Sequence, residues 1–213
     1  MDILIPAQRF SQSKSRLSTR FSEAERSELS RSMLGRVLDA FISGSPNARV
    51  HVLSNDPEVL DFSTLRGARP AHDRPNVRGH GDQLRAFASA LNEDQALLVV
   101  MSDLPLITPK DAQTILQACE DASVLTAPDR HQLGTNAAYF RDASCRELHF
   151  GHADSFLRHE AAHAQRAGYR CFQAPAFQLD LDEPDDLDAL CDFVAQRPDQ
   201  DDALVRWLCG SHA

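Results

Sequence analysis

The sequence predicts an α/β fold with a mostly parallel sheet and helices on both faces. Residues 96–102 (ALLVVMS) form a continuous apolar run, which is typical of a parallel strand buried on both sides. Further short apolar runs alternate along the chain with stretches of helical periodicity. Helix-start signals at Ser22 and at Thr108-Pro109 mark where two of the predicted helices begin. Because strands joined by helices generally pair in parallel, we expect one such domain.

The first half of the chain begins with a strand and a long helix. Residues 1–7 (MDILIPA) are an apolar run closed by a proline and predict a buried first strand. A polar loop over 8–20 follows, and Ser22 with Glu25 forms a capping box that opens a helix. Gly44 is placed to end this helix. The next expected elements are a strand over 49–54, a loop with one short strand over 66–81, and a helix over 84–91.

The second half continues the alternation. After the central strand, Thr108 as N-cap, Pro109 at the first helical position and Asp111 predict another helix. The later expected elements are strands over 124–127 and 137–140, a helix capped by Asp154 or Ser155 that runs to Gly168, a mostly extended stretch over 171–182, and a helix over 183–196. We therefore expect one domain over 1–198 and a helical tail over 199–213. Trp207 in this amphipathic tail would pack on the core or on a second subunit, so a homodimer is possible.

Composition narrows the class of protein. A chain of 213 residues fits one domain, and a formal charge of −9 leaves no basic stripe for general nucleic-acid binding. No apolar run is long enough for a membrane helix and no signal peptide is evident, so we expect a cytoplasmic protein that uses no membrane. The five cysteines form no C-x-x-C pair, and in that compartment they are expected to be reduced packing residues.

Charged side chains follow three of the predicted strands. Lys14 and Arg16 come after the first strand, Asp103 after the central one, and Asp180 and Asp182 near the last. In an open parallel sheet, ligands bind beyond the carboxyl ends of the strands. Carboxylates there can hold Mg²⁺, and Lys and Arg can offset phosphate charge. Each residue also has a structural explanation as a turn former, a helix-end carboxylate or a solvated loop charge. Spacing alone therefore predicts a phosphate-handling α/β domain.

A set of motifs in one order makes the prediction more specific. The motifs are Lys14-Ser15-Arg16-Leu17, Ser102-Asp103-Leu104-Pro105-Leu106, Ala127-Pro128-Asp129-Arg130, Gly134-Thr135-Asn136-Ala137, Phe150-Gly151 with Ser155-Phe156 and His159, and Leu179-Asp180-Leu181-Asp182-Glu183-Pro184. With these motifs, nearly the whole chain resembles the 2-phospho-L-lactate guanylyltransferase family of deazaflavin coenzyme F-420 biosynthesis. That resemblance implies the Rossmann-like fold of nucleotide-diphospho-sugar transferases.

The resemblance implies roles for individual residues. Asp103, with Asp180 or Asp182, would hold Mg²⁺, and Lys14, Arg16 and Asp103 would carry the catalysis. The residues implied to bind the small phosphorylated acid are Thr135, Asn136, Gly151 and Ser155, and those implied to bind the nucleotide are Lys14, Arg16, Ser54 and Gln83. The family joins GTP to 2-phospho-L-lactate, phosphoenolpyruvate or 3-phosphoglycerate and releases pyrophosphate. A substrate phosphate oxygen would attack the α-phosphorus in line, so positioning and charge neutralisation would suffice for catalysis.

Three departures from the family pattern bear on substrate choice. Gln8 stands where relatives usually carry a lysine, which removes one phosphate-binding charge. Gly81-Asp82-Gln83 replaces a Gly-Leu-Asn run on the nucleotide side. One extra residue between Gly151 and Ser155 would reshape the loop that binds the acid.

Parts of the sequence also fit other functions. His159-Glu160-Ala161-Ala162-His163 matches the H-E-x-x-H signature of zinc hydrolases, with Glu183 as a conceivable third ligand. A non-catalytic nucleotide-binding regulator would fit Gln8 and Gln83. A molybdopterin-type nucleotidyltransferase is a further alternative, although such enzymes usually have a glycine-rich first loop and this chain has Ser11-Gln12-Ser13-Lys14.

Overall fold

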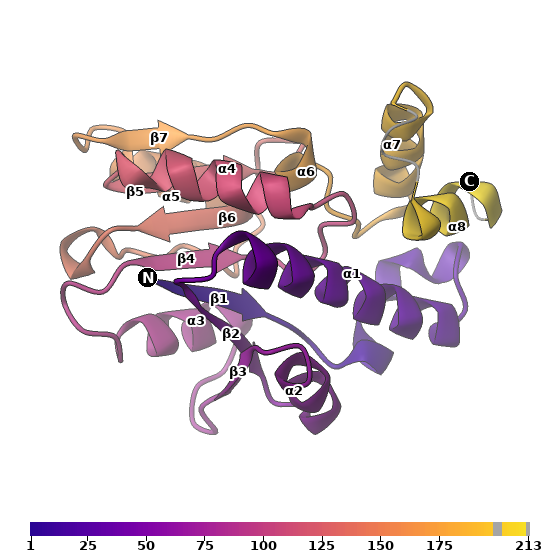
Figure 1. The fold of residues 1–213 in the computed structure, drawn as a ribbon, viewed down its shortest axis with the longest axis horizontal. Coiled ribbons are helices and arrows are strands. Elements are labelled where there is room, and N and C mark those ends of the chain that lie inside the picture. Colours follow the sequence, from indigo (N-terminus) through magenta and orange to yellow (C-terminus); the bar gives the residue numbers. More distant parts are fainter. Residues whose placement is uncertain (198–201, 212–213) are drawn as a thin grey trace.

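A seven-stranded sheet forms the centre of the computed structural model, which describes residues 1–197 and 202–211 (Figure 1). The strand order is β3-β2-β1-β4-β6-β5-β7, and β6 runs antiparallel to both of its neighbours while all other pairs are parallel. The expected mostly parallel sheet is therefore confirmed, with one reversed strand that was not predicted. The strands are β1 (Asp2–Pro6), β2 (Arg49–Ser54), β3 (Arg69–His72), β4 (Leu97–Val100), β5 (Val124–Pro128), β6 (Thr135–Phe140) and β7 (Tyr169–Cys171).

Helices cover both faces of the sheet, and alternate residues of β1 point into the two cores. Ile3 and Ile5 pack with the long helix α1 (Glu23–Gly44) and with α4 (Pro109–Glu120), whereas Leu4 packs with α3 (His80–Ala88). The remaining α-helices are α2 (Pro57–Thr64), α5 (Ser155–His163), α6 (Pro175–Gln178), α7 (Pro184–Ala195) and α8 (Ala203–Ser211), and short 3-10 helices occur at η1 (Phe10–Gln12), η2 (Ser15–Thr19) and η3 (Ala143–Cys145). None of the described helices is long and apolar enough to cross a membrane.

The predicted capping box at Ser22 and the predicted N-cap Thr108 are both confirmed. The Ser22 hydroxyl accepts from the Glu25 backbone N–H and opens α1, and Thr108 does the same with Asp111 at the start of α4. Gly44 is the last residue of α1, as expected, but its role is packing. A Cβ there would lie 2.8 Å from the carbonyl oxygen of Pro109, so glycine allows α1 and α4 to approach closely.

Other boundaries differ from the sequence-based expectations. The short helix α6 lies in a stretch that was expected to be mostly extended, and α2 lies where no element was predicted. Both begin with proline at the first helical position. Helix α3 begins at His80, four residues earlier than expected. Its N-cap is Gly79 with φ +90°, which has no side chain and so gives no capping signal in the sequence. Helix α5 ends at His163, five residues before the expected end at Gly168. Gly168 has a positive φ and lies in the turn that leads into β7.

A disulfide in the C-terminal segment differs from the sequence-based expectation. Cys191 and Cys209 form a disulfide with a Cα–Cα distance of 5.4 Å, so the expectation of five reduced cysteines is wrong for this pair. Spacing could not reveal it, because the two residues meet only where α8 lies beside α7. Cys119 and Cys145 are free and buried as expected, and Cys171 is free and exposed. The Trp207 ring lies 5.4 Å from that of Phe21, so the tail packs on the core; residues 198–201 and 212–213 lie outside the described part.

Candidate metal and nucleotide site

Three carboxylates meet beyond the end of the central strand. Asp103 follows β4, and Asp180 and Asp182 lie between α6 and α7. The Leu181 backbone N–H donates to the Asp103 carbonyl at 3.2 Å, which joins the two segments directly. One oxygen from each of the three carboxylates lies within 4.8 Å of the others. The structure thus brings together the residues predicted to hold a metal.

Lys14 lies between two of these carboxylates. Its Nζ is 2.6 Å from Oδ2 of Asp103 and 2.5 Å from Oδ1 of Asp182, and only 8% of its side chain is exposed. Burial alone would lower the pKa of Lys14, but the charges of Asp103 and Asp182 raise it above its usual value. The Lys14 backbone has φ 55°, a left-handed conformation that is uncommon for a non-glycine residue and is often found at functional positions.

The remaining oxygens of the cluster favour a divalent cation. Oδ1 of Asp103 is buried and has no hydrogen-bond partner among the described residues. Burial, followed by the charge of Asp103, raises the pKa of Asp180 to about 7, although Asn136 donates to this carboxylate at 2.9 Å. For Asp182, Lys14 overcomes the effect of burial and lowers the pKa. Carboxylate oxygens that lack a full set of partners are the kind of ligand that Mg²⁺ prefers.

Two cavities adjoin the cluster. The first, of about 290 Å³, is lined by Lys14, Asp103 and Asp182 among others, and we call it the metal-side cavity. The second, of about 510 Å³, is lined mainly by polar residues between η1 and the loop before α3, and we call it the polar cavity. Pro6, Ala7, Gln8 and His80 line both cavities. A ligand could therefore extend from the carboxylates into the polar cavity.

The residues predicted to bind the nucleotide do not all face these cavities. Gln83 lines the polar cavity, but its amide accepts from the Arg74 N–H and donates to the carbonyls of Arg74 and Val77. Ser54 is buried, and its hydroxyl accepts from the Asp56 N–H. Arg16 has a 70% exposed side chain and pairs with Glu183 at 2.8 Å.

The residues predicted to bind the acid form a separate, tightly bonded cluster. The Thr135 N–H donates to the Ser155 hydroxyl at 3.0 Å, and the Asn136 amide donates to Asp180 and to the Phe177 carbonyl. Gly151 has φ +89°, and a Cβ there would lie 2.9 Å from the Gly81 nitrogen. None of Thr135, Asn136, Gly151 and Ser155 lines either of the two cavities. Asn136 alone reaches the carboxylate cluster.

The H-E-x-x-H motif is part of the core. His159 Nε2 accepts from the His149 N–H at 2.9 Å, so the ring carries its proton on Nδ1 and donates it to the Thr135 hydroxyl at 3.0 Å. Burial, with the charges of His149 and His163, lowers the pKa of His159 to about 3. His163 Nε2 lies 3.1 Å from the Glu147 carbonyl. With both rings bonded in this way, the motif offers no zinc site.

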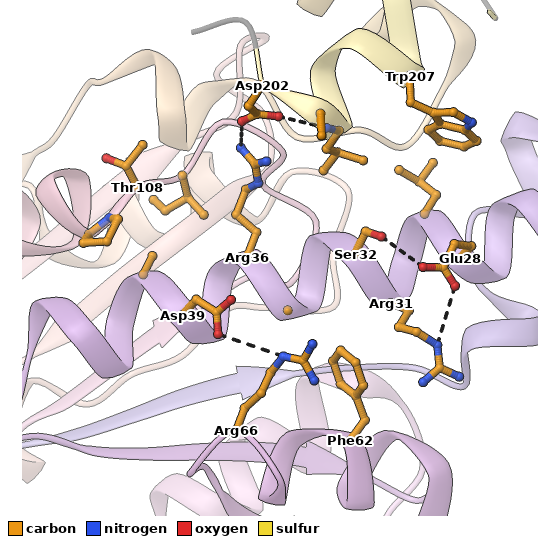
Figure 2. A pocket seen from close by; sticks show the side chains of 17 residues that line it. Glu28, Arg31, Ser32, Arg36, Asp39, Phe62, Arg66, Thr108, Asp202 and Trp207 are labelled. Carbon is orange, nitrogen blue, oxygen red and sulfur yellow. Dashed lines mark hydrogen bonds and ion pairs between the residues drawn. The ribbon is translucent and has the colours of Figure 1, made fainter.

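A third cavity, larger than the metal-side cavity and the polar cavity, lies away from the carboxylates. It measures about 760 Å³ and follows the outer face of α1, between α2 and α8 (Figure 2). Its charged side chains are paired with each other: Arg36 with Asp202, and Arg66 with Asp39 at 3.9 Å (Figure 2). The Arg66 guanidinium also lies 3.8 Å from the centre of the Phe62 ring. We therefore place the candidate site at the carboxylates and not in this larger cavity.

Sequence reasoning missed two residues of the site, His80 and Asp73. His80 lines both cavities, and Asp73 lines the polar cavity. His80 opens a helix that was predicted to start later, and Asp73 lies in a stretch expected to be mostly loop. The placement of Asp73 directly after the short strand β3 was a signal that could have identified it.

Comparison with known proteins assigns the family. Residues 1–193 match the model of the family described as guanylyl transferase CofC like. The chain belongs to this family. A phosphoenolpyruvate guanylyltransferase from Sphaerobacter thermophilus is 37% identical over 195 residues, covering 88% of this chain and 90% of the relative. A 2-phospho-L-lactate guanylyltransferase from Methanocaldococcus infernus is 30% identical over 188 residues, covering 88% and 82%. The predicted family is confirmed, and with it the enzyme class, a nucleotidyltransferase.

Solved structures agree on the fold of this CofC-like chain. A protein from Desulfovibrio desulfuricans G20 described as a nucleotide-diphospho-sugar transferase superposes with a TM-score of 0.74 at 17% identity, covering 97% of this chain and 93% of that one. A nucleotidyl transferase from Methanothermobacter thermautotroptrophicus gives a TM-score of 0.61 at 14% identity, covering 93% and 96%. The predicted fold is therefore confirmed.

Proposed function

We propose that this protein is a Mg²⁺-dependent guanylyltransferase that transfers GMP from GTP to the phosphate of a small phospho-acid and releases pyrophosphate. The acids we propose are phosphoenolpyruvate, 2-phospho-L-lactate or 3-phosphoglycerate, with coenzyme F-420 biosynthesis as the pathway. Support comes from family membership and from the names of relatives that are 30–37% identical. The structural observation that supports it most is the convergence of Asp103, Asp180, Asp182 and Lys14 beside two joined cavities.

The aspartates and Lys14 would have different roles in the reaction. Asp103, Asp180 and Asp182 would hold Mg²⁺, which when bound supplies positive charge against the phosphates. Lys14 would place a further positive charge in the metal-side cavity, where the triphosphate would enter. The acceptor phosphate is already ionised and can attack the α-phosphorus directly, so no side chain has to act as nucleophile or remove a proton. Positioning and charge neutralisation by these four side chains are then the protein's contribution.

A substrate matrix tests this function. GTP, ATP and CTP are each mixed with the three phospho-acids and Mg²⁺, and pyrophosphate release is measured. We expect release with GTP and at least one of the acids, and little with ATP or CTP. Asp103→Asn should fold normally, because the residue follows a strand and does not fill the core, and its rate should fall at least about a thousandfold if the carboxylate holds the metal. Binding of GTP without pyrophosphate release in any combination would contradict the proposal and favour a regulator.

A further inference from the structure

The polar cavity contains a carboxylate to which no function has been assigned. Its lining includes cations and amides, but Asp73 is the only acidic residue among the described residues that line it. The side chain of Asp73 is half-buried, and no lysine or arginine in the described part of the chain forms an ion pair with it. Arg9, one of the two arginines in this lining, is paired instead with Asp56 at 2.7 Å. Asp73 is thus available to a ligand.

The backbone around Asp73 is fixed before any ligand arrives. The Asp73 N–H donates to the Ser54 carbonyl at 3.3 Å, which continues the pairing of β2 with β3. The next residues are held by the buried Gln83, whose amide makes three hydrogen bonds to the backbone of Arg74 and Val77. Gln83 therefore supports the loop, and the carboxylate beside it is preorganised. Partial burial also raises the pKa of Asp73, and the charge of nearby His80 offsets only part of this effect.

The two cavities give a bound nucleotide a direction. Phosphates belong in the metal-side cavity, where Lys14 and the aspartates lie. His80 and Gln8 line both cavities, so the ribose and base would extend past them into the polar cavity. Asp73, in the polar cavity, would then lie beside the base. It would not lie beside the phosphates, whose negative charge a carboxylate repels.

The chemistry of the bases then selects a ligand. Guanine presents two neighbouring donors, N1–H and the exocyclic N2 amino group, and the two oxygens of a carboxylate can accept one bond from each. Adenine presents an acceptor at N1 and no amino group at C2, so a carboxylate in that position would be left unpaired. We propose that Asp73 binds the N1–H and N2 amino edge of guanine and so determines the choice of GTP. This inference rests on the proposed function of the same site.

Replacement of Asp73 by asparagine should shift the base preference of the protein from guanine toward xanthine. In xanthine a carbonyl replaces the amino group at C2, so the asparagine oxygen can accept from N1–H while its amino group donates to that carbonyl. Binding of GTP, XTP and ATP to the full-length protein is measured calorimetrically in the presence of Mg²⁺. The wild type should prefer GTP. Asp73→Asn should bind GTP about tenfold to a hundredfold more weakly, as expected for a lost charged hydrogen bond, and should bind XTP more tightly than the wild type does.

Controls separate this inference from the proposed function. Asp61→Asn, on the exposed side of α2 and outside both cavities, should keep the wild-type preference. A measurement on the wild type needs no substitution: ITP lacks the N2 amino group and should bind about tenfold more weakly than GTP. If the wild type does not prefer GTP to ATP, the proposed function itself fails. If it prefers GTP but Asp73→Asn keeps the wild-type ratio of GTP to XTP affinity, only the assignment of Asp73 is overturned.

Discussion

The Nζ of Lys14 lies 2.6 Å from Oδ2 of Asp103, two residues that are 89 positions apart in the sequence. The same ammonium lies 2.5 Å from Asp182, so a protein cation occupies part of the space between the carboxylates. Such a cation offsets the repulsion among the carboxylates when no metal is bound. It must also compete with a divalent ion for the same oxygens.

Removal of this ammonium should therefore strengthen metal binding in the absence of nucleotide. We expect Lys14→Met to bind Mn²⁺ about tenfold more tightly, which corresponds to about 1.4 kcal/mol, because one competing charge is lost. The same variant should bind GTP more weakly, because a phosphate partner is lost. Titration of Mn²⁺ followed by its paramagnetic resonance signal measures the first effect. The control is Lys110→Met, an exposed residue of α4; weaker Mn²⁺ binding in Lys14→Met than in this control would contradict the competition.

The sequence predicted the metal-binding side of the site better than the base-binding side. Asp103 follows a continuous apolar strand and Asp182 precedes a proline-initiated helix, so strong local signals lie beside both residues. Gln83 was assigned to the nucleotide, yet its amide holds the backbone of the preceding loop. Its partners are backbone groups of that loop, and side-chain pattern carries no information about where such groups lie. Asp73 was overlooked because a four-residue edge strand, β3, gives little periodicity.

The antiparallel direction of β6 was also not predicted, because the sequence pattern of the strand itself does not specify it. Its sequence, TNAAYF, is buried along its whole length and would suit a strand of either direction. The direction is fixed by a short connection from β5, residues 129–134, in which Asp129 accepts from the Leu133 and Gly134 N–H groups. A tight connection of this kind joins antiparallel strands. A connection of only six residues between two strands therefore indicates an antiparallel pair in the sequence itself.

Asp180 should make the metal-free protein less stable as the pH rises. Its pKa is raised from 3.8 to about 7 in the native state, so between these values the folded protein holds a proton that the unfolded chain has released. Stability therefore falls as the pH rises through this range. Asp180→Asn should remove much of that slope, because the amide stays neutral and can still accept from Asn136. Unfolding of EDTA-treated protein in urea at about pH 5 and about pH 8 measures the difference. An unchanged slope in the variant would show that Asp180 is ionised throughout.

Gly81 should tolerate no side chain. A Cβ there would lie 1.9 Å from the carbonyl oxygen of Phe150, so Gly81→Ala must displace either the start of α3 or the loop at Gly151. We expect a loss of about 1–3 kcal/mol in the free energy of unfolding, as for other overpacked positions. The matched control is Gly210→Ala in α8, where nothing lies within 4 Å and alanine should be neutral or slightly stabilising. Equal stability of the two variants would mean that the loop yields at no cost.

The disulfide should hold α8 against the rest of the protein. Cys191 and Cys209 are 18 positions apart, and closing a loop of this size stabilises a fold by about 3 kcal/mol. Thiol titration in denaturant should count three free thiols before reduction, since the structure leaves Cys119, Cys145 and Cys171 free, and five afterwards.

The single tryptophan reports on the same helix. Trp207 lies in α8 with its ring 5.4 Å from that of Phe21, so its fluorescence should change when α8 leaves the core. In Cys209→Ser we expect this change at lower urea concentration than in the wild type, because only noncovalent contacts then oppose the release of the helix. Cys171→Ser, which replaces an exposed free thiol, should leave the transition in place. A transition that is the same in Cys209→Ser and in the wild type would mean that noncovalent contacts hold the tail, with the disulfide contributing nothing measurable.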